Sequence, residues 1–340
     1  MAEPARAAVT LADVAALAGV SLNTVSRALR APHTVRPPLR RRIEEVLDEL
    51  NYVPNRLAGG LAGSQSGVVG VILTSLFFSE FAAVVDTLQA ELADAGFNVM
   101  LGNSRYDPEE ELRLVRAMLS WRPAAMALVG IDRHPRAADL LRASGIPVIE
   151  VWDAVGEAID SAVGMDHSAI GAMQTRHLLA QGYRRPAFIG CVRVHDYRAH
   201  KRLAGYQTAA REAGLEPIWM AEPTGGHPDL GERLALRVLE ACPEVDALVC
   251  NSDVIAMGAL RGLRGRVPED IGVIGFGDNE AGPCLNPSLT SIHPPRAEIG
   301  RRAAAVIAAR IAGEPASHHL FEAGLALRQS TVRSAKGDSA

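Results

Sequence analysis

Apolar runs alternate with amphipathic stretches along most of this chain. Short runs rich in Val, Ile, Leu and Ala, typical of buried strands, lie at 68–73, 97–101, 125–129 and 147–151, and again at 187–191, 218–221, 247–250 and 272–276. Apolar positions at helical spacing predict helices at 82–95, 108–120, 137–144, 169–181, 201–213, 230–241 and 255–263. Strands that alternate with helices predict a parallel, doubly wound sheet, and the restart of the pattern near residue 169 predicts two lobes.

Residues 8–54 have helical periodicity without a strand-like run, which predicts a small all-α domain. Thr10 and Asp13 have capping-box spacing, so a first helix begins there. Gly19 ends this helix because glycine adopts the bent conformation past a helix end at little cost, and Ser21 caps a second helix through its side-chain oxygen. The apolar positions expected to face inward are Val14, Leu17, Ala18, Val25 and Leu29.

Two helices joined by such a turn form a helix-turn-helix, whose second helix can enter the DNA major groove. An ordinary helical hairpin with polar residues in water would have the same periodicity. The charge pattern favours DNA binding, because no acidic residue lies between Asp13 and Glu44 whereas six arginines do. The predicted DNA contacts in this segment are Ser21, Leu22, Asn23, Thr24, Ser26 and Arg27.

After a third predicted helix at 39–50 comes a linker with a distinctive sequence. Residues 50–58 read Leu-Asn-Tyr-Val-Pro-Asn-Arg-Leu-Ala, and Leu61 lies just before Gly-Ser-Gln-Ser. Together with a helix-turn-helix that starts near residue 10, this order resembles the LacI/GalR family of bacterial transcription regulators. The resemblance implies that residues 55–66 form a hinge helix on DNA, with Ala58 and Leu61 as contacts. Gly59 and Gly60 each disfavour a helix by about 1 kcal/mol, and a flexible linker is the alternative.

The resemblance extends over residues 67–333 and implies a two-lobed, periplasmic-binding-protein-like core with crossovers near residues 163–168 and 289–294. Ligands of doubly wound folds bind at the carboxyl ends of the strands, so the cleft between the lobes should collect the loops that follow them. Aromatic, charged and hydrogen-bonding residues in those loops suit a small polyhydroxylated ligand, and Arg202, Asp253 and Asp278 match the family's usual effector contacts. The predicted effector contacts are Phe78, His134, Trp152, Arg202, Asp253 and Asp278.

Composition and charge narrow the class of protein. The net charge is −4, but residues 1–66 hold eight arginines against six acidic residues, so the excess positive charge lies at the predicted DNA-binding end. The four cysteines form no CxxC pair and the N-terminus has no long apolar run, which predicts reduced thiols, a cytoplasmic location and no membrane segment. The sequence has no Walker loop, HExxH motif or nucleophile elbow. We therefore expect no enzyme activity, no cofactor and no metal site.

These features predict a sugar-responsive transcription repressor that binds a palindromic operator on double-stranded DNA as a homodimer. Residues 118–121, 145–153, 163–167 and 275–278 resemble the gluconate-operon branch of the family, which implies a sugar-acid effector. An activator, or a regulator whose effector promotes DNA binding, is the nearer alternative. A free sugar receptor or a sugar-processing enzyme is the rival from another class, and it would need a signal peptide or a catalytic constellation.

Overall fold

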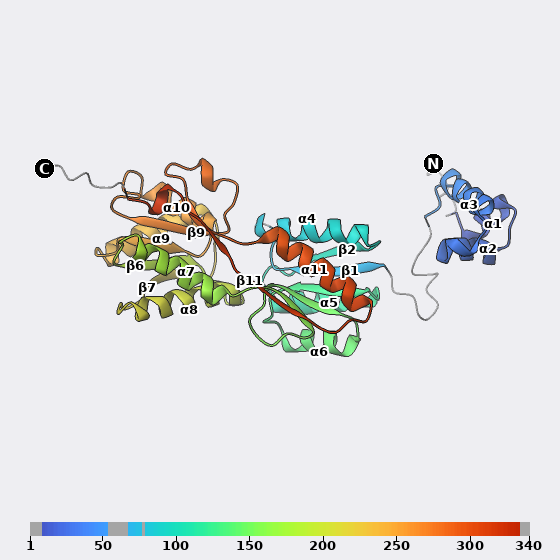
Figure 1. Cartoon of the computed structure of the whole chain (residues 1–340), viewed down its shortest axis with the longest axis horizontal. Helices are drawn as coiled ribbons and strands as arrows, with labels where there is room; N and C mark the ends of the chain where they lie inside the picture. Colours follow the sequence, from blue (N-terminus) through green and yellow to red (C-terminus); the bar gives the residue numbers. More distant parts are fainter. Residues whose placement is uncertain (1–8, 54–66, 77–78, 334–340) are drawn as a thin grey trace, which may run out of the picture. The chain divides into compact units, whose positions relative to one another are not determined.

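The computed structural model describes residues 9–53, 67–76 and 79–333 (Figure 1). The chain divides into two compact units, Met1–Ser66 and Gly67–Ala340. The first unit is a helical headpiece and the second is a two-lobed α/β core, each with its own apolar interior. Among the helices in the described ranges, none is long and apolar enough to cross a membrane.

The headpiece consists of α1 (Leu11–Ala18), α2 (Leu22–Arg30), the short 3-10 turn η1 (Pro32–Thr34) and α3 (Pro37–Glu49). The predicted capping box is present: the Thr10 amide donates to the Asp13 carboxylate at 2.8 Å, and the Asp13 amide donates to the Thr10 hydroxyl. Gly19 ends α1 with φ at 69°, and the Ser21 hydroxyl accepts the amide of Thr24 at 3.2 Å at the start of α2. The predicted helix-turn-helix is confirmed.

The headpiece core differs from the predicted one at two leucines. Leu17 and Leu29, expected to face inward, are 43% and 36% exposed. The buried face of α1 is centred between Val14 and Ala15, and Leu17 lies beyond the edge of that face at about 100° of rotation per residue. The buried residues of the headpiece are Val14, Ala15, Val25, Ala28, Val35, Ile43 and Val46.

The first lobe of the core is a six-stranded parallel sheet with helices on both faces (Figure 1). Helices α4 (Ser79–Asp94) and α11 (Arg296–Ile311) cover one face, and α5 (Pro108–Ser120) and α6 (Pro135–Ser144) cover the other. The strand order is β11-β5-β4-β3-β1-β2. The strands are β1 (Val68–Leu73), β2 (Asn98–Asn103), β3 (Ala125–Val129), β4 (Val148–Asp153), β5 (Ser161–Met165) and β11 (His318–Phe321).

The second lobe repeats this plan with strand order β12-β10-β9-β8-β6-β7. Helices α7 (His167–Ala180) and α8 (Tyr197–Glu212) cover one face, and α9 (Pro228–Ala241) and α10 (Asp253–Gly262) cover the other. Two 3-10 turns, η2 (Gly282–Cys284) and η3 (Gln329–Thr331), follow β9 and β12. The strands are β6 (Pro186–Cys191), β7 (Ile218–Glu222), β8 (Ala247–Cys250), β9 (Gly272–Phe276), β10 (Thr290–His293) and β12 (Gly324–Ala326).

The chain passes between the lobes three times. β5 leads into α7, and β10 leads into α11, so these two crossovers lie where the sequence predicted them. The third, from β11 to β12, was not predicted because both strands are short and only half-buried, and they lack the apolar runs of the others. β12 pairs with β10 in the antiparallel sense at the edge of a sheet whose other strands are parallel.

Helices α7 and α8 approach each other closely at two glycines. A Cβ added to Gly171 in α7 would overlap the backbone carbonyl of Arg202, and one added to Gly205 in α8 would overlap the backbone carbonyl of Ser168. Both positions therefore need glycine, and the contact fixes where the side chains of α8 enter the space between the lobes.

We predict that Gly205→Ala lowers the free energy of unfolding by about 1–3 kcal/mol, as overpacking of a filled interior does. The loss should outweigh the roughly 1 kcal/mol that alanine gains over glycine within a helix. Urea unfolding measures the change, with Thr208→Ala as the control because Thr208 is exposed on the same helix. An alanine variant as stable as the wild type would show that α7 and α8 can separate freely.

Candidate functional site

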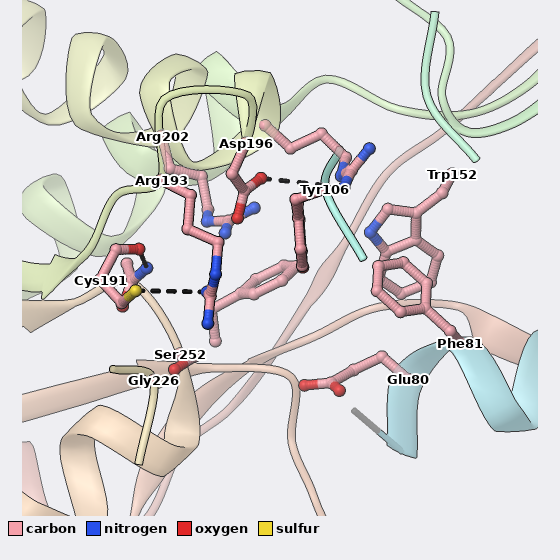
Figure 2. A pocket seen from close by; sticks show the side chains of 13 residues that line it. Glu80, Phe81, Tyr106, Trp152, Cys191, Arg193, Asp196, Arg202, Gly226 and Ser252 are labelled. Carbon is pink, nitrogen blue, oxygen red and sulfur yellow. Dashed lines mark hydrogen bonds and ion pairs between the residues drawn. The ribbon is translucent and has the colours of Figure 1, made fainter. Parts of the chain in front are cut away.

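A pocket that is partly open to solvent lies between the two lobes of the core (Figure 2). Several lining residues sit at or just after strand ends, as expected for this fold. The first lobe contributes Glu80, Phe81, Tyr106 and Trp152. The second contributes Cys191, Arg193, Asp196, Arg198, Arg202, Gly226, Asn251, Ser252 and Phe276.

Aromatic rings from both lobes form one wall of the pocket. The Trp152 ring packs edge-to-face against Phe81, with centroids 5.6 Å apart, and against Phe276, with centroids 6.4 Å apart. In Figure 2, Phe81 and Trp152 lie together on the side opposite Cys191. Trp152 is only 2% exposed, so this wall is an apolar surface fixed by packing.

Two arginines on the second lobe are largely committed to protein partners. Arg193 donates to Cys191 Sγ at 3.2 Å and to the backbone carbonyl of Gly225 at 2.8 Å. Arg198 donates to the Thr74 hydroxyl of the first lobe at 3.0 Å. Both guanidinium groups also lie over the ring of Tyr106, 5.1 Å and 5.9 Å from its centroid. Both arginines place positive charge at the pocket, and their contacts with Thr74 and Tyr106 connect the second lobe to the first.

Arg202 is held by a different set of contacts. Its guanidinium carbon lies 4.4 Å from the centroid of the Phe276 ring, and its Nη1 lies 2.9 Å from His167 Nδ1. Because arginine can only donate, Nδ1 must accept, so the ring proton of His167 is on Nε2. That Nε2 donates to the backbone carbonyl of Trp152 at 3.2 Å. Burial, and then the charge of Arg202, hold the pKa of His167 well below its usual range, in agreement with a neutral ring.

Two buried polar atoms of the lining residues have no hydrogen-bond partner among the residues that the structure describes. One is the Nε of Arg202, a donor. The other is the Oδ1 of Asn251, an acceptor whose neighbour Nδ2 donates to the Cys191 carbonyl at 2.6 Å. A buried donor or acceptor left unpaired costs about 1–3 kcal/mol. Both atoms are therefore polar groups without a protein partner beside the pocket.

Two carboxylates also line the pocket, and neither neutralises Arg202 by direct contact. Asp196 caps α8 by accepting the Ala199 amide at 3.2 Å, and it lies 3.8 Å from Arg198 Nη2. Burial raises the pKa of Glu80, which favours its neutral form. Three arginines against two acids leave the pocket positively charged. Over the described ranges no group of three or more His, Cys, Asp or Glu side chains could hold a metal ion.

The structure brings together two of the predicted effector contacts, Trp152 and Arg202, which both line the pocket. Phe78 lies outside the described residues. His134 does not line the pocket: its Nδ1 accepts the Arg136 amide at 3.1 Å at the start of α6, and its Nε2 lies 3.3 Å from a Glu109 oxygen.

Asp253 and Asp278, predicted because they match the family's usual effector contacts, do not line the pocket. Asp253 is 1% exposed, and its carboxylate contacts the Ser291 hydroxyl at 2.6 Å and accepts the Asn279 amide at 2.8 Å. Asp278 pairs with His293 Nδ1 at 2.8 Å and Arg328 Nη2 at 2.7 Å. Both carboxylates join β9 and its loop to neighbouring segments of the second lobe.

The other eleven lining residues were not among the predicted effector contacts, and they include Glu80, Tyr106, Arg193, Arg198 and Asn251. The predicted helix began at residue 201, whereas α8 begins at Tyr197, so Arg198 stands in its first turn. Asn251 could have been predicted from the sequence, because it directly follows the last residue of β8. Asp253, the residue that was predicted, is already the first residue of α10. Asn251, the residue nearest the end of the strand, would have been the better prediction of a pocket residue than Asp253.

In the headpiece, the N-terminal part of α2 presents an exposed polar face. Leu22 is 48% exposed, and Asn23 and Arg27 are exposed as well. The basic run at the start of α3 is partly neutralised, because Arg40 lies 3.4 Å from Glu44 and Arg42 lies 3.8 Å from Glu45. The predicted contacts Ala58 and Leu61 lie outside the described residues.

Comparison with known proteins decides the family. A family model for bacterial regulatory proteins of the lacI family matches residues 10–55, and one for a periplasmic binding protein-like domain matches residues 175–331. The transcriptional regulator GntR of Pseudomonas aeruginosa is 36% identical over 331 residues, which cover 95% of each protein. The chain belongs to the LacI family.

Solved structures of LacI-family regulators agree with this. A family member from Silicibacter pomeroyi has a TM-score of 0.90 at 34% identity, covering 96% of this chain and all of that one. The lac repressor dimer bound to operator and the anti-inducer ONPF has a TM-score of 0.81 at 26% identity, covering 95% and 99% of the two chains. The predicted fold class is confirmed, and the chain is a DNA-binding transcription regulator rather than an enzyme.

Burial of Asp253 gives this LacI-family core a pH-dependent stability. Burial raises the pKa of Asp253 from 3.8 to about 7, so the folded chain holds a proton that the unfolded chain releases. The Ser291 hydroxyl and the Asn279 amide donate to the Asp253 carboxylate and lower its pKa, but burial outweighs both contacts. This contribution to stability is complete below pH 3.8 and is lost as the pH rises through about 7.

We predict that Asp253→Asn flattens the dependence of stability on pH between 5 and 8. The amide group mimics the neutral acid and has no proton to lose, whereas one titrating proton contributes a slope of up to about 1.4 kcal/mol per pH unit. Urea unfolding of both chains at several pH values measures the difference, and the variant should gain most over the wild type at pH 8. Parallel stability curves would contradict the assignment.

Proposed function

We propose that this LacI-family chain is a repressor that binds a palindromic operator as a homodimer and is released by a sugar acid of the gluconate type. The effector assignment is carried by the two unpartnered pocket atoms of the described residues, Arg202 Nε and Asn251 Oδ1. One needs an acceptor and the other a donor. A hydroxylated carboxylate supplies both within one small molecule.

The charge of the pocket favours an acid over a neutral sugar. With Nη1 of Arg202 occupied by His167, the parallel N–H groups of Nε and Nη2 remain for two carboxylate oxygens. A neutral sugar would leave this cationic edge without an anion, at a cost of about 1–3 kcal/mol. That cost corresponds to a preference for the acid of about tenfold or more.

The remaining lining residues suit the rest of such a molecule. The wall of Phe81, Trp152 and Phe276 can pack against the C–H faces of a polyol chain. The carboxyl groups of Asp196 and Glu80 can accept from hydroxyl groups and disfavour a second negative charge such as a phosphate. The identity with GntR and the gluconate-branch segments of the sequence support the same class of effector.

For the DNA side, the exposed face of α2 supports major-groove binding. Ser21, Leu22, Asn23, Thr24, Ser26 and Arg27 remain the proposed contacts there, with Ala58 and Leu61 in the linker. The similarity to the operator-bound lac repressor dimer supports a homodimer that reads two mirrored half-sites. Closure of the lobes on the effector would change the spacing of the two headpieces and release the operator.

We predict that gluconate raises the melting temperature of the full chain far more than glucose does. At about a hundred times its Kd, a ligand stabilises a protein by roughly 2.7 kcal/mol. Arg202→Gln should weaken gluconate binding by tenfold or more. The affinity of Arg202→Lys should lie between those of the wild type and Arg202→Gln, because lysine keeps the charge but lacks the two parallel N–H groups that bind a carboxylate. Equal shifts with gluconate and glucose, or none with any sugar acid, would refute the effector assignment.

We predict that DNA selection with the full chain returns two-fold symmetric sites whose affinity falls steeply with salt. Arg27→Ala should reduce the slope of log K against log salt by about one, as loss of one phosphate contact does. Asn23→Ala should instead relax sequence preference at one position in each half-site. Asymmetric sites would contradict the homodimer, and tighter operator binding with gluconate would contradict release and identify the effector as a corepressor.

A further inference from the structure

His167 stands at the point where the chain enters the second lobe and touches groups from both lobes. It is the first residue of α7, immediately after the crossover from β5. Its Nε2 donates to the carbonyl of Trp152 in the first lobe, and its Nδ1 accepts from Arg202 on α8 of the second. It is the last residue of the segment 163–167 that resembles the gluconate branch, but it was not a predicted contact and it does not line the pocket.

We infer that His167 is a positioning residue that turns the free edge of Arg202 toward the effector and so sets the preference for an acidic ligand. This inference rests on the proposed sugar-acid effector. The donor–acceptor pattern of the ring carries it: one nitrogen must be a donor for Trp152, which leaves the other as an acceptor for Nη1. With Nη1 fixed there, the Nε edge is the part of the guanidinium that stays available.

Burial makes the alternative orientations costly. His167 is fully buried and Arg202 is 6% exposed, so the solvent that would otherwise satisfy Nη1 is excluded. The Phe276 ring lies against the guanidinium, with its centroid 4.4 Å from the central carbon, and blocks movement on that side. Without an acceptor at His167 Nδ1, the side chain of Arg202 loses the contact that fixes Nη1, and its Nε edge is no longer held in one orientation.

Two substitutions test the hydrogen bonds of the two ring nitrogens of His167 separately. In His167→Asn, the amide oxygen lies near the position of Nδ1 and keeps an acceptor for Arg202. In His167→Gln, the longer side chain brings its amide nitrogen near the position of Nε2 and keeps the donor for Trp152, but it offers no acceptor at Nδ1. Calorimetric titration of each full chain with gluconate measures the effect. His177→Asn is the control, because His177 lies further along α7 and contacts Thr331 instead.

We predict that His167→Asn stays within about threefold of the wild-type Kd, whereas His167→Gln loses about tenfold or more. In the Arg202→Gln background the two variants should bind equally, because the group that they position is absent. Equal losses in both variants, or a difference that persists without Arg202, would overturn the inference. A wild-type chain that binds no sugar acid would refute the proposed effector instead.

A spectroscopic measurement tests the inference independently of any effector. Nitrogen-15 correlation spectra of the ten histidines distinguish the two neutral tautomers, and loss of one signal in His167→Asn assigns His167. The geometry requires a proton on Nε2 and none on Nδ1. A proton on Nδ1 at neutral pH would exclude acceptance from Arg202 and overturn the positioning role.

Discussion

The burial of a guanidinium group without a carboxylate in contact is the constraint on which the pocket depends. Among the described residues, Arg202 is stabilised by an aromatic face, by one imidazole acceptor and by more distant acids. Removing a charge from water is costly unless its donors are satisfied, and Nε has no partner. The site is therefore incomplete by itself, and an anionic ligand would supply the missing acceptor.

The rest of the core places this arginine accurately. The glycine contacts at Gly171 and Gly205 fix α8 against α7, and the crossover after β5 brings His167 between Trp152 and Arg202. Hydrogen bonds thus run from a backbone carbonyl of one lobe to a charged side chain of the other. With the proposed effector bound, a change in the relative position of the lobes would act on the orientation of Arg202 through these hydrogen bonds, and the ligand would act in return on the lobes.

Features of the fold that depend on a few neighbouring residues could be predicted from the sequence, whereas features that depend on distant residues could not. The capping box of α1, the glycine turn and the strands that carry continuous apolar runs were found because each is written into a few neighbouring residues. The short strands β11 and β12 depend on distant partners and have no such pattern. Arg202 was predicted because it matches a usual effector contact of the family, and Trp152 because it follows the strand expected at 147–151. The structure places Arg202 within α8 and Trp152 within β4, and the direction of each side chain was not predictable. Asp253, two residues after Asn251, accepts a hydrogen bond from Ser291 and does not line the pocket.

The most direct test of the account is a crystal structure of the full chain with gluconate bound. We expect the ligand between Trp152 and Arg202, with its carboxylate oxygens on Nε and Nη2 of Arg202 and a hydroxyl group donating to Asn251 Oδ1. A carboxylate bound to Arg193 or Arg198, with Arg202 Nε still unpartnered, would contradict the account.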